Sequence, residues 1–344
     1  MRKATIDDVA ELAGVSIKTV SRVVNREPNV RESTRAKVES AIAKLNYRPN
    51  LSARNLASHR SHLIGLVYDD PAKYELPSAG YIINMQQGAL RACGSAFFEL
   101  LIHPCNYRQK QVGAQLKSLI EEMRPAGIIL AAPLSNMPKV VRAIEATGTP
   151  CVLISPGSHD ANHLAVATND RETSAEMTRY LASLGHRRIA FITGHPNHAA
   201  VANRFLGYQD GLKESGLSFS TRLVVAGDNS FGSGEIAAEK LLKRKQPPTA
   251  IFAANDDMAA GVIRVADRLG IEIPRQLSVA GFDDIALARQ VYPALTTIRQ
   301  PLVDMAERAA SMLIRGKKGQ ASVGVTEIVP AALQIRESTG PAPD

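Results

Sequence analysis

The chain has 344 residues, of which 45% are hydrophobic and 22% are charged, a composition typical of globular rather than disordered proteins. This length allows about two or three domains, and no apolar run approaches the roughly 18 residues that predict a membrane span. The formal net charge is +8, and most of it comes from residues 1–60, which hold twelve Lys or Arg and six Asp or Glu. That concentration of charge predicts a polyanionic partner for the N-terminal segment.

The three cysteines indicate a reducing compartment. Cys93, Cys105 and Cys151 are an odd number and show no C-x-x-C spacing, so we expect free thiols. The basic N-terminus is not followed by the apolar segment of a secretory signal. We therefore expect a cytoplasmic protein.

The first fifty residues predict three short helices. Thr5 is a candidate N-cap for a helix that begins at the next residue, and Gly14 supplies the permissive backbone of a tight turn. Ser16 can cap a second helix across 17–24, and the apolar spacing predicts a third over Arg35–Tyr47. Three short helices with a glycine turn between the first two are typical of a helix-turn-helix unit.

The polar face of the second helix carries side chains that suit nucleic acid. In a helix-turn-helix unit this helix enters the major groove. Lys18 and Arg22 lie four residues apart on its outward face and suit guanine edges, whereas Ile17 can pack on a thymine methyl. The short donors suit phosphate contacts, and these are Ser16, Thr19, Ser21 and Asn25. For this helix taken alone, an ordinary solvated surface helix is the alternative.

The segment after the third helix predicts a fourth, weaker helix. Pro49 ends the third helix, and Asn50 can cap a helix over 51–57. Because so short a helix is only marginally stable in water, we expect it to order when it meets a partner. Leu56, presented beside the small Ala53, can wedge between base steps in the minor groove.

From residue 63 onward, apolar runs alternate with helix-length segments. This alternation is typical of parallel sheets covered by helices on both faces. Nine runs are too many for one sheet, so we predict two doubly wound sheets with a break in the polar segment 155–163 and a ligand cleft at the carboxyl ends of the strands. The runs are LIGLVYDD, FFELLIH, GIILAAP, CVLIS, LAVATND, IAFITG, RLVVAGD, AIFAAND and LSVAGFDD.

Polar residues follow several of these strands, and some are expected to serve the local structure. Asn169 or Asp170, and also Asp256, precede helical segments and are predicted caps. His186 follows the end of a helix and is expected to interact with its C-terminus. Asp283 is the better site candidate, because its Gly-Phe-Asp-Asp turn precedes no helix that needs two carboxylates.

Sequence motifs of common enzyme classes are absent. The chain has no G-x-G-x-x-G, G-x-x-x-x-G-K-S/T or G-x-S-x-G motif. His195 and His198 have i, i+3 spacing without a third ligand nearby, so a loop after a strand explains them better than a metal site. We therefore predict no catalytic residues, no metal and no cofactor.

Two parts of the sequence resemble the LacI/GalR family of bacterial transcription regulators. "TIDDVAELAGVSIKTVSRVVN" and "TRAKVESAIAKLNYRPNLSARNLA" resemble its DNA-binding headpiece and hinge, and "LGHRRIAFITG", "AIFAANDDMAAGVI" and "SVAGFDDI" resemble its effector domain, which is similar to periplasmic sugar-binding proteins. One departure is Arg31, which replaces the usual N-cap of the third helix and for which Ser33 is expected to substitute. The predicted DNA-binding residues are Thr5, Ser16, Ile17, Lys18, Thr19, Ser21, Arg22, Asn25, Asn29, Ala53, Arg54 and Leu56.

The resemblance also implies an effector site in the cleft. An Arg–Asp pair can donate to and accept from neighbouring sugar hydroxyls, and an aromatic face covers the apolar side of a sugar ring. Ser155 stands where some members carry an acidic residue, and "SAGYIINM" replaces the usual Asn-Pro-Phe-Phe. The predicted effector-binding residues are Tyr81, Ser155, Arg204, Phe231, Asn255, Asp283 and Gln300.

These observations predict a homodimeric, DNA-binding transcription regulator of carbohydrate-utilisation genes, and repressors are the commonest members of the family. Two-fold symmetry implies a pseudo-palindromic operator on double-stranded DNA, and the effector is expected to be a mono- or disaccharide. One alternative is a corepressor-dependent regulator that responds to a purine or nucleoside. Another is a sugar-binding protein or enzyme with an incidental N-terminal domain. No membrane partner is expected.

The predicted fold class is α plus α/β. Residues 1–49 form the helix-turn-helix domain, 50–61 the hinge helix and linker, and 62–340 the effector-binding and dimerisation domain. Within the last, the N-subdomain is predicted at about 62–160 plus 300–325, and the C-subdomain at about 161–299 plus 326–340.

Overall fold

The computed structural model describes residues 4–24, 30–47, 61–70, 80–157, 163–316 and 324–343. The chain divides into two compact units, Met1–His62 and Leu63–Asp344, each with its own hydrophobic core. The predicted hinge helix over 51–57 lies outside the described residues. So do five of the predicted DNA contacts, namely Asn25, Asn29, Ala53, Arg54 and Leu56.

In the described residues of the first unit there are three helices, α1 (Ile6–Ala13), α2 (Ile17–Val24) and α3 (Glu32–Leu45). The Thr5 hydroxyl accepts a hydrogen bond from the backbone N–H of Asp8 at 3.3 Å, and the Asp8 carboxylate accepts one from Thr5 N at 2.7 Å, which confirms the predicted cap. Gly14 has a φ of +65°, and Ser16 Oγ accepts from Thr19 N at 3.2 Å, so the turn and the second cap are also confirmed. The buried core residues are Val9, Ala10, Val20, Val23, Val38 and Ala41.

The third helix begins three residues earlier than predicted. Its N-cap is Arg31, whose side chain makes no capping hydrogen bond, and Ser33 lies inside the first turn. The expectation that Ser33 substitutes as the cap is therefore wrong. The helix ends at Asn46, which has a left-handed φ of 46°. Asparagine tolerates this conformation better than most residues, which explains an end before the predicted Tyr47.

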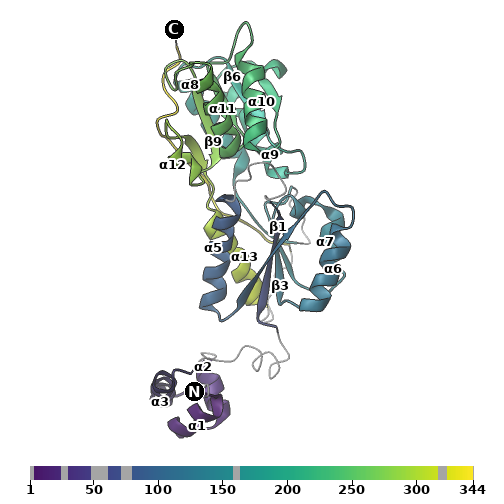
Figure 1. Cartoon of the computed structure of the whole chain (residues 1–344), viewed down its shortest axis with the longest axis vertical. Coiled ribbons are helices and arrows are strands. Elements are labelled where there is room, and N and C mark those ends of the chain that lie inside the picture. Colours follow the sequence, from purple (N-terminus) through teal and green to yellow (C-terminus); the bar gives the residue numbers. More distant parts are fainter. Residues whose placement is uncertain are drawn as a thin grey trace. The chain divides into compact units, whose positions relative to one another are not determined.

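The described residues of the second unit form two sheets, as predicted, and each sheet has six strands (Figure 1). The first sheet is parallel throughout, in the order β11-β5-β4-β3-β1-β2. Figure 1 shows α5 and α13 on one side of this sheet and α6 and α7 on the other; we call this assembly the N-subdomain. Its elements are β1 (Leu63–Asp69), α5 (Gly80–Ser95), β2 (Glu99–Cys105), α6 (Val112–Met123), β3 (Gly127–Leu130), the 3₁₀ turn η2 (Leu134–Asn136), α7 (Pro138–Glu145), β4 (Cys151–Ile154), β5 (Leu164–Ala167), α13 (Leu302–Gly316) and β11 (Thr326–Ile328).

The second sheet has the order β12-β10-β9-β8-β6-β7, and only the pairing of β12 with β10 is antiparallel. We call this sheet and its helices the C-subdomain. Its elements are α8 (Asp170–Ser183), β6 (Ile189–Thr193), α9 (Ala199–Glu214), the 3₁₀ turn η3 (Thr221–Leu223), β7 (Val224–Ala226), α10 (Phe231–Leu242), β8 (Ala250–Ala253), α11 (Asp256–Arg268), β9 (Ser278–Asp283), α12 (Leu287–Gln290), β10 (Thr296–Arg299) and β12 (Ala332–Gln334).

The division between the subdomains lies one strand later than the predicted break at 155–163. β5 pairs with β4, so it belongs to the N-subdomain, and β11 pairs with β5 rather than joining the C-subdomain. The polar segment marks a connection between neighbouring strands, and its composition carries no signal of which sheet the next strand joins. The chain instead crosses between Ala167 and Asp170, between Arg299 and Leu302, and between Ile328 and Ala332.

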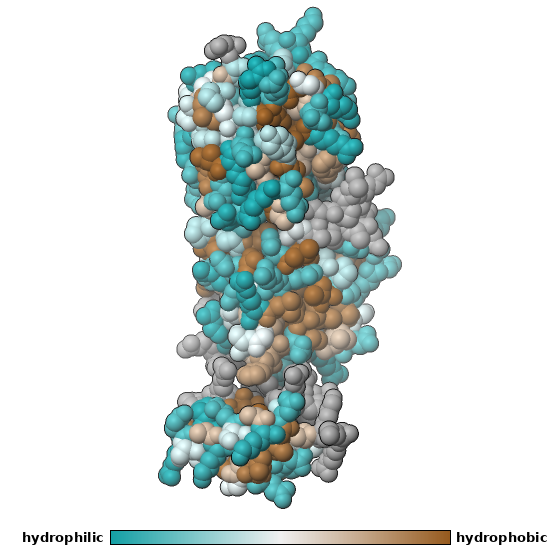
Figure 2. Space-filling view, turned by 60° about the vertical axis from the view of Figure 1, so that its left-hand side comes forward, coloured by the Kyte–Doolittle hydropathy of each residue, from teal (hydrophilic) through white to brown (hydrophobic). Residues whose placement is uncertain are grey.

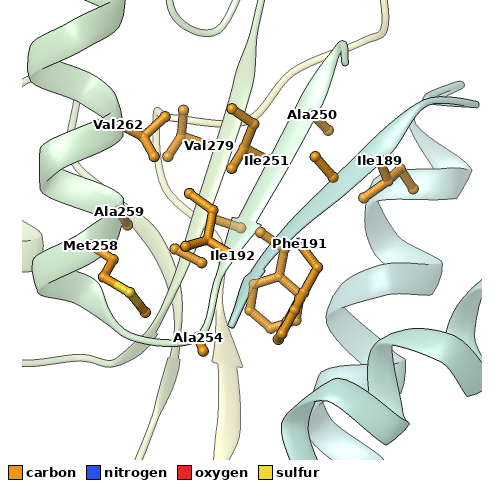
Figure 3. Packing of buried hydrophobic residues seen from close by; sticks show 14 of the residues in the cluster. Ile189, Phe191, Ile192, Ala250, Ile251, Ala254, Met258, Ala259, Val262 and Val279 are labelled. Carbon is orange, nitrogen blue, oxygen red and sulfur yellow. The ribbon is translucent and has the colours of Figure 1, made fainter. Parts of the chain in front are cut away.

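The core of the C-subdomain follows the two-residue period of its strands. Figure 3 shows Ile192 and Ile251 on the side of α11, where they lie near Val262. Phe191, one residue before Ile192, points to the opposite side, where its ring stacks on Tyr208 of α9 at a centroid distance of 4.9 Å. Because successive side chains alternate across a strand, one apolar run supplies both faces. The carboxyl ends of β6, β8 and β9 are thereby held together at one edge of the sheet.

Gly88 lies at the contact between α5 and α13, and we expect Gly88→Ala to destabilise the chain. A Cβ at this position would lie 1.9 Å from the backbone oxygen of Val303, so α13 would have to move away. Overpacking of this kind costs about 1–3 kcal/mol. Urea unfolding of the full chain measures this loss. Gly94→Ala in the same helix is the matched control, because its Cβ would meet no atom within 4 Å; an equal loss in both variants would contradict the packing explanation.

Candidate functional site

The outward edge of α2 is open to solvent. Ser16, Ile17, Lys18 and Arg22 are exposed, and Ile17 keeps 47% of its surface accessible, whereas Val20 and Val23 are buried. Exposed cations can contact guanine edges, and an exposed apolar side chain can contact a thymine methyl. The helix therefore presents the predicted edge.

Three of the predicted DNA contacts, Thr5, Ser16 and Thr19, make side-chain hydrogen bonds within the unit. The Thr5 hydroxyl is engaged in the capping box with Asp8, at 2.8 Å from the carboxylate. The hydroxyls of Ser16 and Thr19 hydrogen-bond to each other at 2.9 Å. Ser21 and Thr19 are only half-buried, so both remain within reach of solvent.

A cavity of about 180 Å³ lies in the second unit, and residues of both subdomains line it. All seven residues predicted for the effector lie in its wall: Tyr81, Ser155, Arg204, Phe231, Asn255, Asp283 and Gln300. Two come from the N-subdomain, four from the C-subdomain, and Gln300 comes from a crossing segment. The strand ends thus converge as the predicted topology requires.

Arg204 of α9 is the buried cation of this cavity. Its Nε donates to Asp170 at 2.8 Å and its Nη1 donates to the backbone oxygen of Ala254 at 2.6 Å. Nη1 also lies 3.5 Å from the Asp283 carboxylate, and the guanidinium stacks 3.7 Å above the ring of Phe282. The prediction of Asp170 as a helix cap is therefore wrong, because its carboxylate is committed to Arg204.

Asp283 is buried at the end of β9 with a left-handed φ of 121°. Its carboxylate accepts a hydrogen bond from Gln300 Nε2 and faces Arg204. Burial raises the pKa of Asp283 to about 6, although Arg204 and the bond from Gln300 oppose the rise. A strained backbone and a destabilised carboxylate in a cavity are typical of a functional site.

This raised pKa predicts a pH dependence of stability. An acid whose pKa is higher in the folded state binds more protons there, so its contribution to stability is fully present below about pH 4 and lost as pH rises through about 6. We expect Asp283→Asn to remove this loss. The free energy of unfolding of the variant, relative to that of the unsubstituted chain, should rise by on the order of 1–3 kcal/mol from pH 4.5 to pH 7. Urea unfolding of both proteins at both pH values measures this change. If the difference in free energy of unfolding between the two proteins were the same at pH 4.5 and pH 7, the prediction would be contradicted.

Asn255, and not the predicted Asp256, caps α11. Asn255 is the N-cap of α11, because its Oδ1 accepts from Met258 N at 3.0 Å, while its Nδ2 donates to the backbone oxygen of Asn229. Asp256 lies fully buried behind it and accepts from Ile285 N at 3.0 Å and from the Thr297 hydroxyl. The prediction of Asp256 as a cap is therefore wrong, and Asn255 combines a cap with a place in the cavity wall.

Two further local predictions fail because distant segments supply the partners. Asn169 occupies the N-cap position of α8 without a capping bond, and its Oδ1 instead accepts from Ala331 N at 2.8 Å, which ties two crossing segments together. The ring of His186 is fully buried and lies within hydrogen-bond distance of Thr249 Oγ1, Ser278 Oγ and the backbone oxygen of Gly340. His186 therefore joins three segments rather than capping a helix.

Tyr81 and Phe231 are the two aromatic residues predicted for the cavity that line it. Burial raises the pKa of Tyr81, and the negative charge of Asp283 adds to the effect. The phenol therefore remains a hydrogen-bond donor at neutral pH. Ser155 is buried with a φ of 50°, and a hydroxyl here is smaller than the acidic side chain of some family members.

The sequence did not single out several residues of the cavity wall. Asp69, Asp228 and Asp257 were visible only as polar strand ends, and the loop after β2 carried no signal. Burial lowers the pKa of His198 to about 3, with His195 and Arg204 contributing, so this imidazole is neutral. His195 and His198, which the sequence analysis assigned only to a loop after a strand, also line the cavity. The other wall residues that were not assigned to the site are Asp69, Tyr107, Arg108, Asp228, Asn229, Ser230 and Asp257. Within the described part of the chain, no three His, Cys, Asp or Glu residues are grouped to hold a metal ion.

None of the helices in the described ranges is long and apolar enough to cross a membrane.

Known proteins show the same two-part organisation. Residues 5–50 match the family model of bacterial regulatory proteins, lacI family, and residues 178–339 match a periplasmic binding protein-like domain. The chain is 33% identical to the HTH-type transcriptional regulator GalR of Escherichia coli (strain K12), over 97% of this chain and 95% of the relative.

Solved structures extend the likeness to the whole chain. A complex of the transcriptional regulator CelR with cellobiose has a TM-score of 0.75 and 28% identity, covering 97% of this chain and 99% of that one. A lac repressor dimer bound to operator and the anti-inducer ONPF has a TM-score of 0.76 and 27% identity, covering 98% and 100%.

Proposed function

The chain belongs to the LacI family of bacterial regulatory proteins, and we propose that it is a homodimeric repressor of carbohydrate-utilisation genes whose operator affinity depends on a sugar in its cleft. It is a DNA-binding transcription regulator and not an enzyme. The observation that carries the effector proposal is the convergence of seven predicted side chains from separate stretches on one cavity. Since bacterial operators lie in the cytoplasm, we place the protein there.

We propose that α2 reads the operator through Ile17, Lys18 and Arg22, whose exposure on one edge supports this role. The other predicted contacts would position the headpiece on the phosphates or, for the segment around Leu56, enter the minor groove. A pseudo-palindromic operator follows from two copies of this edge related by a two-fold axis. The dimer has support from exposed apolar residues of the N-subdomain, which include Ile83 and Leu90 of α5 and Ile102 of β2. Figure 2 shows an apolar area on the face of this subdomain turned to the viewer.

We expect Arg22→Ala to weaken operator binding by about 1–3 kcal/mol and to relax the preference at one base pair of each half-site. The operator is first selected from random DNA by the unsubstituted protein, and affinities for all single-base variants are then measured at fixed salt. Lys37→Ala, an exposed cation on α3, is the control for a loss of charge alone. If Arg22→Ala weakened all sequences equally, the side chain would contact phosphate instead.

The charges of the cavity favour an uncharged effector. The ionisable acids of its wall are Asp69, Asp228, Asp257 and Asp283, against the cations Arg108 and Arg204. Arg204 is already paired with Asp170, and the pKa values of His195 and His198 are lowered, so neither imidazole supplies a positive charge at neutral pH. A sugar phosphate or sugar acid would enter a negative field, whereas hydroxyl groups can donate to the carboxylates. The complex of CelR with the neutral disaccharide cellobiose accords with this choice.

A cleft ligand can control DNA binding only if it binds two states of the protein unequally. The three crossing segments allow the subdomains to change their relative angle, and a sugar held by both would favour one angle. If the sugar favours the angle at which the dimer binds the operator, it acts as a corepressor. If it favours the other angle, it acts as an inducer.

Thermal-shift screening of the full chain tests the effector class. We expect a neutral mono- or disaccharide to raise the melting temperature and then to change the affinity for the selected operator. A shift with purines or nucleosides alone would favour the corepressor alternative. Sugar turnover without specific DNA binding would overturn the proposed function.

A further inference from the structure

A hydrogen bond between side chains joins the two subdomains across the cleft. Tyr107 follows β2 in the N-subdomain, and His195 follows β6 in the C-subdomain. Tyr107 Oη lies 2.8 Å from His195 Nε2, and the two rings meet edge to face at a centroid distance of 5.5 Å and an interplanar angle of 79°. Both residues line the cavity, so this bond forms part of its wall.

The surrounding hydrogen bonds fix the proton positions. The backbone N–H of Asn197 donates to His195 Nδ1 at 3.1 Å, so Nδ1 carries a lone pair and the neutral ring carries its proton on Nε2. Nε2–H therefore donates to Tyr107 Oη, which also accepts from Arg108 Nε at 3.2 Å. Burial lowers the pKa of His195, with the charge of Arg108 contributing, and a neutral ring agrees with this arrangement.

Each partner is anchored within its own subdomain. Tyr107 is 5% exposed and packs in the cluster that contains Leu116 and Leu130, and its backbone N–H donates to Asp69 at 3.4 Å. The backbone N–H of His195 donates to Asn229 Oδ1 at 3.3 Å. Because each residue is bonded to its own subdomain, a separation of the subdomains would lengthen this hydrogen bond.

We propose that Tyr107 and His195 form a latch that stabilises the closed cleft before any effector binds. The three crossing segments permit the subdomains to separate, and separation must break this bond. The latch therefore sets the resting ratio of open to closed molecules. Its effect on operator affinity rests on the proposed function, whereas its effect on the cleft does not.

Tyr107→Phe tests the latch, because it removes only the hydroxyl. Nitroxide labels attached through unnatural ketone side chains at positions 117 on α6 and 240 on α10 report the distance between the subdomains in the full chain without ligand. One net hydrogen bond changes an equilibrium roughly two- to twelve-fold, so we expect the open-to-closed ratio to rise by that factor. Tyr180→Phe is the matched control, since its hydroxyl bonds to Thr339 at 3.0 Å within the C-subdomain.

The double variant tells whether the two substitutions act through the one hydrogen bond or through independent effects. If the bond is the cause, Tyr107→Phe with His195→Gln should open the cleft no further than the larger single change. An unchanged distance distribution in a folded Tyr107→Phe protein would overturn the proposal, as would an equal opening in Tyr180→Phe. Because the measurement uses no DNA and no sugar, its outcome is independent of whether the chain is a sugar-responsive repressor.

Discussion

Asp283→Ala is expected to abolish the effector response while leaving effector-free operator affinity unchanged. Asp283 is the acceptor at the centre of the cavity, where it faces Arg204 and receives the amide of Gln300. Removing it leaves Arg204 with only Asp170 as a charged partner and deprives ligand hydroxyls of their acceptor. Unpaired polar groups on protein and ligand cost about 1–3 kcal/mol each, so affinity should fall at least tenfold. Titration of the identified effector into the operator complex measures the loss.

Two controls separate a lost contact from a disturbed fold. Asp283→Asn keeps an acceptor oxygen for Gln300 but loses the charge that faces Arg204, so it should retain part of the response. Asp210→Ala removes a half-buried acid on α9 that pairs with Arg171, outside the cavity wall, and should respond normally. A normal response of Asp283→Ala would remove this residue from the effector site.

The parts of the fold that could be predicted are those that neighbouring residues determine. The capping box of Thr5, the turn at Gly14 and the span of α2 all depend on residues within a few positions of each other. The nine apolar runs became strands because a buried strand needs only a short apolar segment. The remaining strands β10, β11 and β12 read TTIR, TEI and ALQ, so polar residues interrupt the apolar run that marks the other strands.

The parts that could not be predicted depend on partners far along the chain. The local sequence predicts Asp170 as a helix cap, but its carboxylate instead accepts a hydrogen bond from Arg204. Asp256 was also predicted as a cap, but its carboxylate accepts hydrogen bonds from Ile285 and Thr297, which lie later in the chain. Tyr107 and His195 are 88 positions apart and neither belongs to a motif. The effector-binding residues could be predicted because they match positions of the resembled family that contact the effector. No local sequence pattern distinguished them.

We expect Asp284→Ala to be the most destabilising of the proposed substitutions. The partners of Asp284, like those of Asp170 and Asp256, lie on other elements and could not be predicted from its neighbours in the sequence. The Asp284 side chain is fully buried and accepts hydrogen bonds from Arg299 of β10 at 2.6 Å, from Arg336 at 2.6 Å and from Arg289 of α12 at 3.1 Å. It therefore holds the C-terminal segment and α12 against β10. Breaking a buried ion pair from one side costs about 3–5 kcal/mol, and since Arg289 and Arg299 are half-exposed and can be rehydrated, we expect about 3 kcal/mol.

The pH dependence of this loss distinguishes the two aspartates. Burial alone would raise the pKa of Asp284, but its bonds to Arg299 and Arg336 hold it below its ordinary value. The carboxylate is therefore ionised at every pH above about 4, and its contribution disappears only when pH falls below that range. The destabilisation by Asp284→Ala in urea unfolding should then be equal at pH 5 and pH 7, whereas the effect of Asp283→Asn changes over the same interval. A loss that grew between pH 5 and pH 7 would mean that Asp284 is partly protonated at pH 5 and that the three arginines do not hold its charge.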